Sequence, residues 1–386
     1  MSKGTPVPIT GSVLQWAMAE AGLAAEDVAH RLKVEPNTVQ GWIVGSYHPN
    51  KTQFEALTTL LKRPSAIFFM PAPPATDPAR ANYRRTMGSE ERDLKPEESR
   101  WIRTARRMQE VTSWLLKQQG ALPIELPAWS LDNNPEKVAG LERARIGVSV
   151  NDQVRWRDEF VAFRNWRATL ENLGILSFRF EIGAGACRGF SLWDDQAPLI
   201  AVNTSGYNPA SRAYTMLHEY AHLLLRTGAV CVDYSPRKGG DRLERWCETF
   251  AAAFLLPRDH VRKYVEQKFP IPRSGYRIVD FEDVRKVAGH YKVSLRAAAL
   301  RLIELGLAPA SLYASVDRLA IASTKKSSQG GSMTKSQRRL QEYGHRVPSI
   351  LLDGLHNDLL GLHDVLDYMD MDYKQLDDLT SMLAVG

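Results

Sequence analysis

The sequence has little cysteine and no long apolar segment. Only three cysteines (Cys187, Cys231 and Cys247) occur in 386 residues, and none forms a CxxC pair. This argues against a disulfide framework and favours a reducing compartment, with all three thiols buried. No apolar run approaches the roughly 18 residues that span a membrane. The first residues also lack the apolar core and cleavage site of a signal peptide. We therefore expect a cytoplasmic protein with no membrane partner.

The composition is that of an ordinary globular protein, but the charge is unevenly distributed. The sequence is 44% hydrophobic and 24% charged, and its length predicts two or three domains. The net charge is +6, yet the residues from Ile350 onward contain eight Asp and one Lys, which leaves +13 on the rest. This asymmetry predicts an acidic C-terminal segment that docks on the basic body or repels nucleic acid. A solvated helical face explains it equally well.

The first 70 residues show helical spacing of apolar side chains in short segments separated by turn residues. Four or five helices of about ten residues predict a helix-turn-helix domain. The domain resembles the XRE (Cro/repressor-like) family, with Asn37 as the expected N-cap of the helix presented to DNA. The candidate DNA contacts are Asn37, Thr38, Gln40 and Lys51. Between residues 11 and 65, however, five acidic residues balance five basic ones, so docking to a protein remains the alternative.

A proline-rich stretch and a long helix, expected over 96–119, follow this domain. After Gly174 the pattern changes to short strand-like runs at 175–180, 189–192 and 198–202, separated by Gly and Asp turns. We expect a small antiparallel sheet here, directly before the segment that contains the main motif.

That motif is His218-Glu219-Tyr220-Ala221-His222. Positions four apart share one face of a helix, so both imidazoles can bind one ion while Glu219 reaches a water in the open coordination position. Zn²⁺ prefers such nitrogen and oxygen ligands, and a catalytic site keeps one position for water. The spacing predicts a metallohydrolase with Glu219 as the general base.

A third ligand must come from outside this helix. The next helical stretch, 243–257, offers Glu244 and Glu248, which lie four apart on one face, and either carboxylate would complete a two-His-one-Glu set. An oxyanion stabiliser is also required. The candidates for the oxyanion stabiliser are His260, Tyr207 and Tyr234, and the sequence does not choose among them.

The chain resembles the ImmA/IrrE family of metallopeptidases, in the subgroup with an N-terminal XRE domain. The resemblance rests on five stretches: 163–167 with 170–176, 188–191, 201–203, the helix with the HEYAH motif, and 244–257. It implies that Glu244, the first Glu of the second helix, binds the metal together with His218 and His222. Glu248 stands where the family often has Asn, and it remains the alternative ligand.

We therefore predict an α+β, mostly α protein: an all-α helix-turn-helix domain, a zincin-like metallopeptidase domain with a small antiparallel sheet, and a C-terminal helical extension. The expected segments are the helix-turn-helix (1–70), a linker and long helix (71–130), the peptidase domain (131–310), a flexible linker (311–334) and the acidic helical extension (335–386).

The resemblance implies a bacterial regulatory zinc endopeptidase that cleaves one partner protein, such as a repressor, with the N-terminal domain targeting it to operator DNA or to that partner. The alternative is a non-enzymatic DNA-binding regulator, or an antitoxin-like protein that sequesters a toxin, with a structural or vestigial zinc site.

Overall fold

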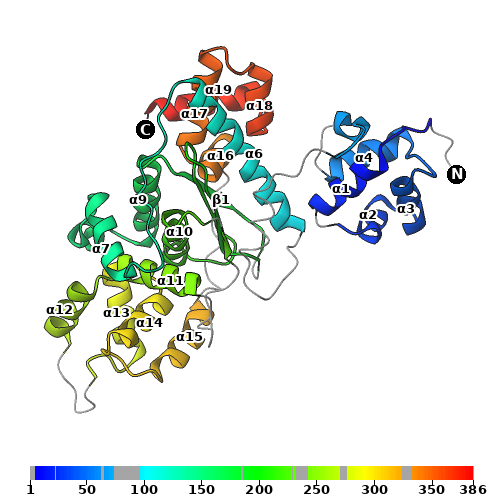
Figure 1. Ribbon diagram of the computed structural model, residues 1–386. Coiled ribbons are helices and arrows are strands. Elements are labelled where there is room, and N and C mark those ends of the chain that lie inside the picture. The colour runs from blue at the N-terminus through cyan, green and yellow to red at the C-terminus, as the bar shows by residue number, and fades with distance from the viewer. Residues whose placement is uncertain are drawn as a thin grey trace. The chain divides into compact units, whose positions relative to one another are not determined.

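The computed structural model describes residues 5–21, 23–61, 65–73, 96–183, 186–227, 229–231, 242–269, 276–323 and 333–385. The chain divides into two compact units, Met1–Thr104 and Ala105–Gly386 (Figure 1). Helices dominate both units and one small sheet lies in the second, which confirms the predicted α+β, mostly α class. The expected proline-rich linker falls largely on residues 74–95, outside the described part of the chain.

The first unit is a small helical domain with its own core. Its elements are α1 (Gly11–Ala21), α2 (Ala25–Leu32), α3 (Pro36–Val44), α4 (Lys51–Leu61) and the 3-10 helix η1 (Ser65–Phe69). Apolar side chains from all five elements form one cluster, with Leu14, Val28, Trp42, Leu57 and Phe68 almost fully buried. The helical spacing in the sequence therefore marks the buried face of each helix correctly.

The start of α3 differs from the prediction. Glu35 is the N-cap residue and Pro36 occupies the first helical position, so Asn37 already lies inside the helix, and its prediction as N-cap was wrong. Proline suits the first helical position because its missing N–H has no partner there, and its ring forces the preceding residue into an extended conformation.

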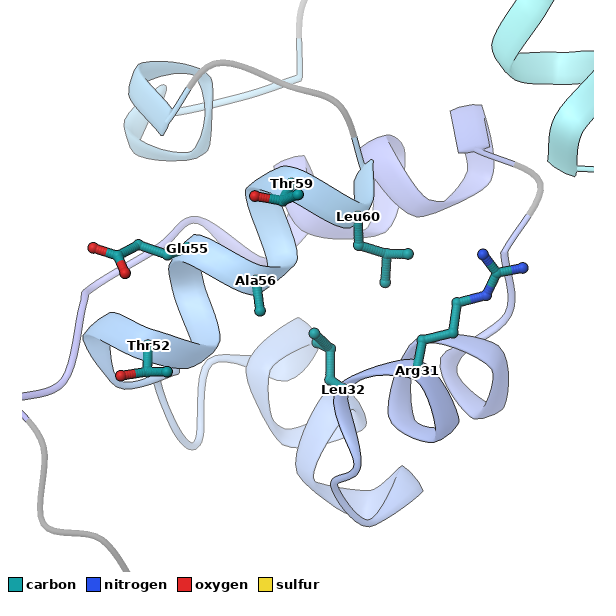
Figure 2. Close-up of a pocket in the computed structure, with 7 residues that line it drawn as sticks. All are labelled: Arg31, Leu32, Thr52, Glu55, Ala56, Thr59 and Leu60. Atoms are coloured by element: carbon teal, nitrogen blue, oxygen red, sulfur yellow. The ribbon is translucent and has the colours of Figure 1, made fainter.

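A shallow hollow of about 510 Å³ lies between α2 and α4 (Figure 2). Leu32, Ala56 and Leu60 form its apolar part, and the charged side chains of Arg31 and Glu55 lie at its rim. Its lining mixes charges of both signs with apolar groups, so the hollow does not indicate a particular ligand.

The second unit is built on helices around a four-stranded sheet (Figure 1). Its helices are the end of α6 (Pro96–Gln118), α7 (Pro135–Arg145), α8 (Val150–Arg155), α9 (Glu159–Asn172), α10 (Pro209–Leu224), α11 (Arg242–Leu255), α12 (Arg258–Lys268), α13 (Phe281–Tyr291), α14 (Leu295–Glu304), α15 (Leu312–Ser323), and α16 to α19 given below. Helix α6 agrees with the predicted long helix to within one residue. Among the described residues, no helix is both long enough and apolar enough to cross a membrane.

The sheet is mixed and not purely antiparallel as expected. Its strands are β1 (Leu176–Phe180), β2 (Gly189–Leu192), β3 (Leu199–Asn203) and β4 (Ala229–Cys231), in the order β1-β3-β2-β4. Strands β2 and β3 form an antiparallel pair, but β1 pairs with the other edge of β3 in parallel. Although β1 and β2 are consecutive in the sequence, β3 lies between them in the sheet, an order that local turn signals do not encode. Strand β4, which the sequence analysis missed, pairs antiparallel with β2.

The segment 311–334, expected to be a flexible linker, begins with a helix. Leu312–Ser323 form α15, and Leu312 and Val316 are buried in the main core. The polar composition that suggested a linker starts only beyond this helix, at residues 324–332, which lie outside the described part of the chain. The prediction of a flexible linker was therefore wrong for residues 312–323. Their apolar residues indicate a helix, but the prediction grouped them with the polar stretch that follows.

The C-terminal extension packs onto the rest of the second unit. It consists of α16 (Lys335–Tyr343), α17 (Arg346–His356), α18 (Leu362–Met369) and α19 (Tyr373–Val385). The ring of Tyr343 lies edge-on against Phe178 of β1, with centroids 5.1 Å apart. Arg107 of α6 forms an ion pair of 2.7 Å with Asp367. One basic side chain of the body thus meets one acidic side chain of the extension, as a docked segment requires.

Candidate metal centre

The HExxH motif lies in the second half of α10, a helix whose residues are mostly buried. The helix is capped by Asn208, whose side chain accepts a hydrogen bond from the Ser211 amide, and Pro209 takes the first helical position. Helix α10 packs on α9, α11, β2 and β3. His218, Glu219 and His222 are fully buried. Burial of three ionisable side chains in the same helix is costly unless they are hydrogen-bonded, paired with an opposite charge or bound to a metal.

The structure brings the two histidines together with Glu244 from the first turn of α11. The Nε2 atoms of His218 and His222 lie 3.2 Å apart, and the Glu244 carboxylate oxygens lie 3.2 Å from His218 Nε2 and 3.4 Å from His222 Nε2. Zinc bonds of about 2.0–2.1 Å at tetrahedral angles place neighbouring ligand atoms about 3.3 Å apart. The three observed distances match that value, so this donor set fits a zinc ion.

His222 is in the protonation state that a metal ligand needs. Its burial, together with the neighbouring His218, lowers the pKa of His222 to about 3, although the Glu244 carboxylate acts in the opposite direction. The imidazole is therefore neutral at neutral pH, and one ring nitrogen keeps a lone pair for coordination.

Glu219 lies beside the metal ligands and against strand β2. A Cβ atom added to Gly189 would stand 3.1 Å from Glu219 Oε1, 2.9 Å from the Ala201 carbonyl oxygen and 2.7 Å from the Thr215 Cγ2 atom. Only glycine allows the strand to approach the helix this closely. Gly189 is part of the stretch 188–191 that supports the family resemblance, but the sequence alone did not reveal this packing role.

The structure separates the two alternative carboxylates. Glu244 belongs to the cluster of possible metal ligands among the described residues, and Glu248 does not. One turn further along α11, the backbone carbonyl of Glu248 accepts a hydrogen bond of 3.1 Å from the Tyr214 hydroxyl. The geometry favours Glu244, as the family resemblance implied.

Three polar side chains hold the far end of α11, the helix that carries Glu244. The carbonyls of Phe254, Leu255 and Leu256 accept hydrogen bonds from Arg143 (2.7 Å), Gln153 (3.0 Å) and Arg301 (3.1 Å), which come from α7, α8 and α14. Two of the three donors are cationic, which suits the negative end of the helix dipole. The orientation of α11 is therefore fixed by three separate elements.

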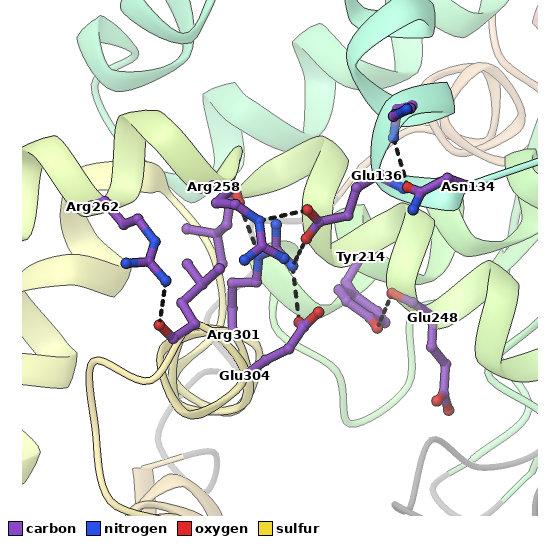
Figure 3. Close-up of polar contacts among 11 residues, drawn as sticks. Asn134, Glu136, Tyr214, Glu248, Arg258, Arg262, Arg301 and Glu304 are labelled. Atoms are coloured by element: carbon purple, nitrogen blue, oxygen red, sulfur yellow. Dashed lines mark hydrogen bonds and ion pairs between the residues drawn. The ribbon is translucent and has the colours of Figure 1, made fainter.

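Arg301 is also the buried centre of a partly exposed ion network (Figure 3). It is 1% exposed and contacts Glu136 at 2.5 Å and Glu304 at 2.9 Å, while Arg258 contacts Glu136 at 2.7 Å. Although partial burial acts to raise it, the pKa of Glu136 is lowered by Arg258 and Arg301. The network ties α7, α12 and α14 together behind α11.

Tyr220 anchors the face of α10 that points away from the metal ligands. Its hydroxyl donates a hydrogen bond of 2.7 Å to Glu142, which is also paired with Arg145 at 2.6 Å and accepts a bond of 3.0 Å from Trp129. Burial and the Glu142 carboxylate raise the pKa of Tyr220 well above its usual value, so it remains a neutral donor.

The predicted DNA contacts all belong to the first unit. In the first unit, Asn37, Gln40 and Lys51 are exposed and Thr38 is half-buried. Lys51 lies 4.0 Å from Glu55.

None of the three oxyanion candidates is placed at the metal ligands by a described contact. The His260 ring is hydrogen-bonded to Tyr291 at 2.8 Å, Tyr207 lies under Arg188 with 5.0 Å to its ring centroid, and Tyr234 is outside the described residues. Cys187 and Cys247 are buried, as predicted, whereas the side chain of Cys231 is outside the described part of the chain.

Comparison with known families agrees with this geometry. Residues 170–302 match the family model described as the IrrE N-terminal-like domain of the M78 peptidases. This segment is about a third of the chain and contains His218, Glu219, His222 and Glu244. A comparison with curated proteins gave no match. The match supports a relationship with the ImmA/IrrE family for this segment and suggests metallopeptidase chemistry with a bound metal, typically zinc.

Proposed function

We propose that the protein is a regulatory zinc-dependent endopeptidase that cleaves a specific partner protein. The observation that carries this proposal is that the Nε2 atoms of His218 and His222 lie 3.2 Å apart and each lies 3.2–3.4 Å from one oxygen of the Glu244 carboxylate, with the buried Glu219 next to His218 in the sequence. A purely structural zinc site closes all four positions with protein ligands and has no use for a general base.

A zinc ion held by His218, His222 and Glu244 would polarise the scissile carbonyl and lower the pKa of the attacking water. The chain's own residues supply the proton transfers. Glu219 accepts the proton of the attacking water and delivers it to the leaving amine. Its burial against Gly189 and Thr215 keeps the carboxylate in one place, so little of its freedom is lost when the substrate binds.

The substitution Glu219→Gln tests the catalytic role. It removes the base but keeps the size of the side chain and leaves the three ligands intact. We expect zinc content equal to that of the wild type and cleavage reduced at least a hundredfold, the usual contribution of a general base. Cleavage can be followed by mass spectrometry after incubation with proteins encoded near the gene. If biological activity survives this change with zinc still bound, the enzyme proposal fails.

We further propose that the first unit directs the peptidase to operator DNA or to its protein partner. Helix α3 presents Asn37 and Gln40 to solvent near its N-terminal end, and both side chains can read base edges. The near neutrality of this unit makes docking to a protein the alternative.

A salt titration distinguishes these two roles. Specific binding to the promoter of the protein's own gene, with affinity that falls as salt rises and is lost in the double substitution Asn37→Ala and Gln40→Ala, would support operator recognition. Absence of salt-dependent specific binding would refute it and favour the docking role.

A further inference from the structure

The end of α10, one turn beyond the metal ligands, has an unusual backbone conformation. The amide of Arg226 donates to the Leu223 carbonyl at 3.0 Å, and the amide of Thr227 donates to the His222 carbonyl at 2.9 Å. Arg226 has a φ of 56°, in the left-handed region. These bonds form a Schellman motif, in which the left-handed position is usually glycine.

An arginine at this position is less favourable than glycine, because its Cβ crowds the following carbonyl. The side chain offsets this cost. The guanidinium of Arg226 stacks on the ring of Trp193, with 3.6 Å to the centroid, and donates a hydrogen bond of 2.5 Å to the Leu126 carbonyl. Both contacts hold the turn onto neighbouring segments.

The turn brings the Thr227 hydroxyl within hydrogen-bond distance of the candidate metal ligand His222. Thr227 Oγ1 lies 3.2 Å from His222 Nδ1 and also 3.2 Å from the His222 carbonyl oxygen. Both contacts are made at once when the single hydroxyl proton goes to the carbonyl, which can only accept, and Thr227 Oγ1 accepts from an Nδ1–H group. This is also the tautomer that leaves the lone pair of Nε2 for a metal beside His218 and Glu244.

We infer that Thr227 is the positioning residue for the zinc ligand His222, and that Arg226 holds Thr227 in place through the left-handed turn. The inference rests on the proposed zinc centre. It adds a residue that selects the ring tautomer and orientation of one ligand. Neither the HExxH spacing nor the third ligand assigns this role.

Zinc affinity, measured by competition with a chromophoric chelator, is the first test. Thr227→Val keeps the shape of the side chain and removes the hydroxyl. We expect its affinity for zinc to fall 10- to 100-fold, as is typical when an outer partner of a metal ligand is lost. Thr227→Ser keeps the hydroxyl and is expected to restore affinity to within a few-fold of the wild type. Equal zinc affinity in the Val and wild-type proteins would overturn the inference.

A second pair of variants tests the turn. Both Arg226→Gly and Arg226→Ala remove the contacts with Trp193 and Leu126. Glycine adopts the left-handed conformation readily, whereas alanine keeps the unfavourable Cβ atom at this position. We expect the Ala variant to bind zinc more weakly than the Gly variant. The reverse order would show that the turn does not hold Thr227.

The tautomer of His222 gives a readout that does not need the metal. In the metal-free wild-type chain, nitrogen-15 NMR shifts should identify the Nδ1–H form of His222, and Thr227→Val should lose that preference. An Nε2–H form in the wild type would refute the inference even if a Thr227 variant failed to fold. Absence of zinc binding by the wild type would instead refute the proposed function on which the inference rests.

Discussion

The substitution Gly189→Ala tests the close approach of β2 to α10. The added methyl group would stand 2.7 Å from the Thr215 methyl and 2.9 Å from the Ala201 carbonyl oxygen, at least roughly 0.5 Å inside ordinary contact. The Thr215 side chain has limited room to move, and the carbonyl belongs to the neighbouring strand β3. We expect a loss of about 1–3 kcal/mol in the free energy of unfolding, the usual cost of overpacking.

Gly140→Ala is the matched control. Gly140 lies in the middle of α7 with open space around its Cβ position. Because alanine loses less backbone entropy than glycine on forming a helix, this variant should gain about 0.5–1 kcal/mol. The two variants make the same chemical change, so the difference between them isolates the packing at the metal helix.

Urea unfolding of the full-length chain measures both variants, with far-UV circular dichroism and tryptophan fluorescence followed together. Coincident transitions would justify a single unfolding free energy, and a separate transition of the first unit would appear as a difference between the two probes. If Gly189→Ala is as stable as the wild type while Gly140→Ala is stabilised, the argument for a glycine-dependent approach is refuted.

Three further predictions concern the metal ligands, the ion network around Arg301, and His290 of α13. Glu244→Ala should abolish stoichiometric zinc binding in elemental analysis, whereas Glu248→Ala should leave about one zinc per chain; the opposite pattern would exchange their roles. Arg301→Ala should cost about 1–3 kcal/mol in urea unfolding, because it removes a buried guanidinium that bonds the Leu256 carbonyl and pairs with the partly exposed Glu136 and Glu304; a loss under about 0.5 kcal/mol would contradict this. Burial and nearby Lys and His side chains lower the pKa of His290 to about 4. The unfolded chain, with the ordinary pKa near 6.5, then binds more protons, so this contribution to stability is complete above about pH 6.5 and is lost as the pH falls toward 4. His290→Phe should flatten the stability profile in that window, and an unchanged slope would contradict the assignment.

The sequence was sufficient for the parts of the fold and site that depend on local periodicity. Helical spacing located the helices of the first unit, and the i, i+4 spacing of His218 and His222 already places both on one face of a helix. The choice of Glu244 needed the family resemblance, because Glu248 shares its helix face and its chemistry.

Other features depend on contacts between distant segments. The parallel pairing of β1 with β3 follows from the path of the chain between strands, not from the composition of either strand. The start of α3 was misplaced because the preference of proline for the first helical turn overrides the capping ability of Asn37. Thr227 had no signal in the sequence, because an arginine in a left-handed conformation before it cannot be recognised from residue type.

The support of α11 by three separate elements has a consequence for biosynthesis. A ribosome delivers the chain from its N-terminus, and domains form as their segments emerge. His218 and His222 emerge well before Arg301, the last of the three side chains that hold the carbonyl end of α11. A nascent chain that ends before α14 therefore has both imidazoles but not the full support for Glu244. In the proposed zinc centre, Glu244 as the third ligand is therefore held in place only late in synthesis.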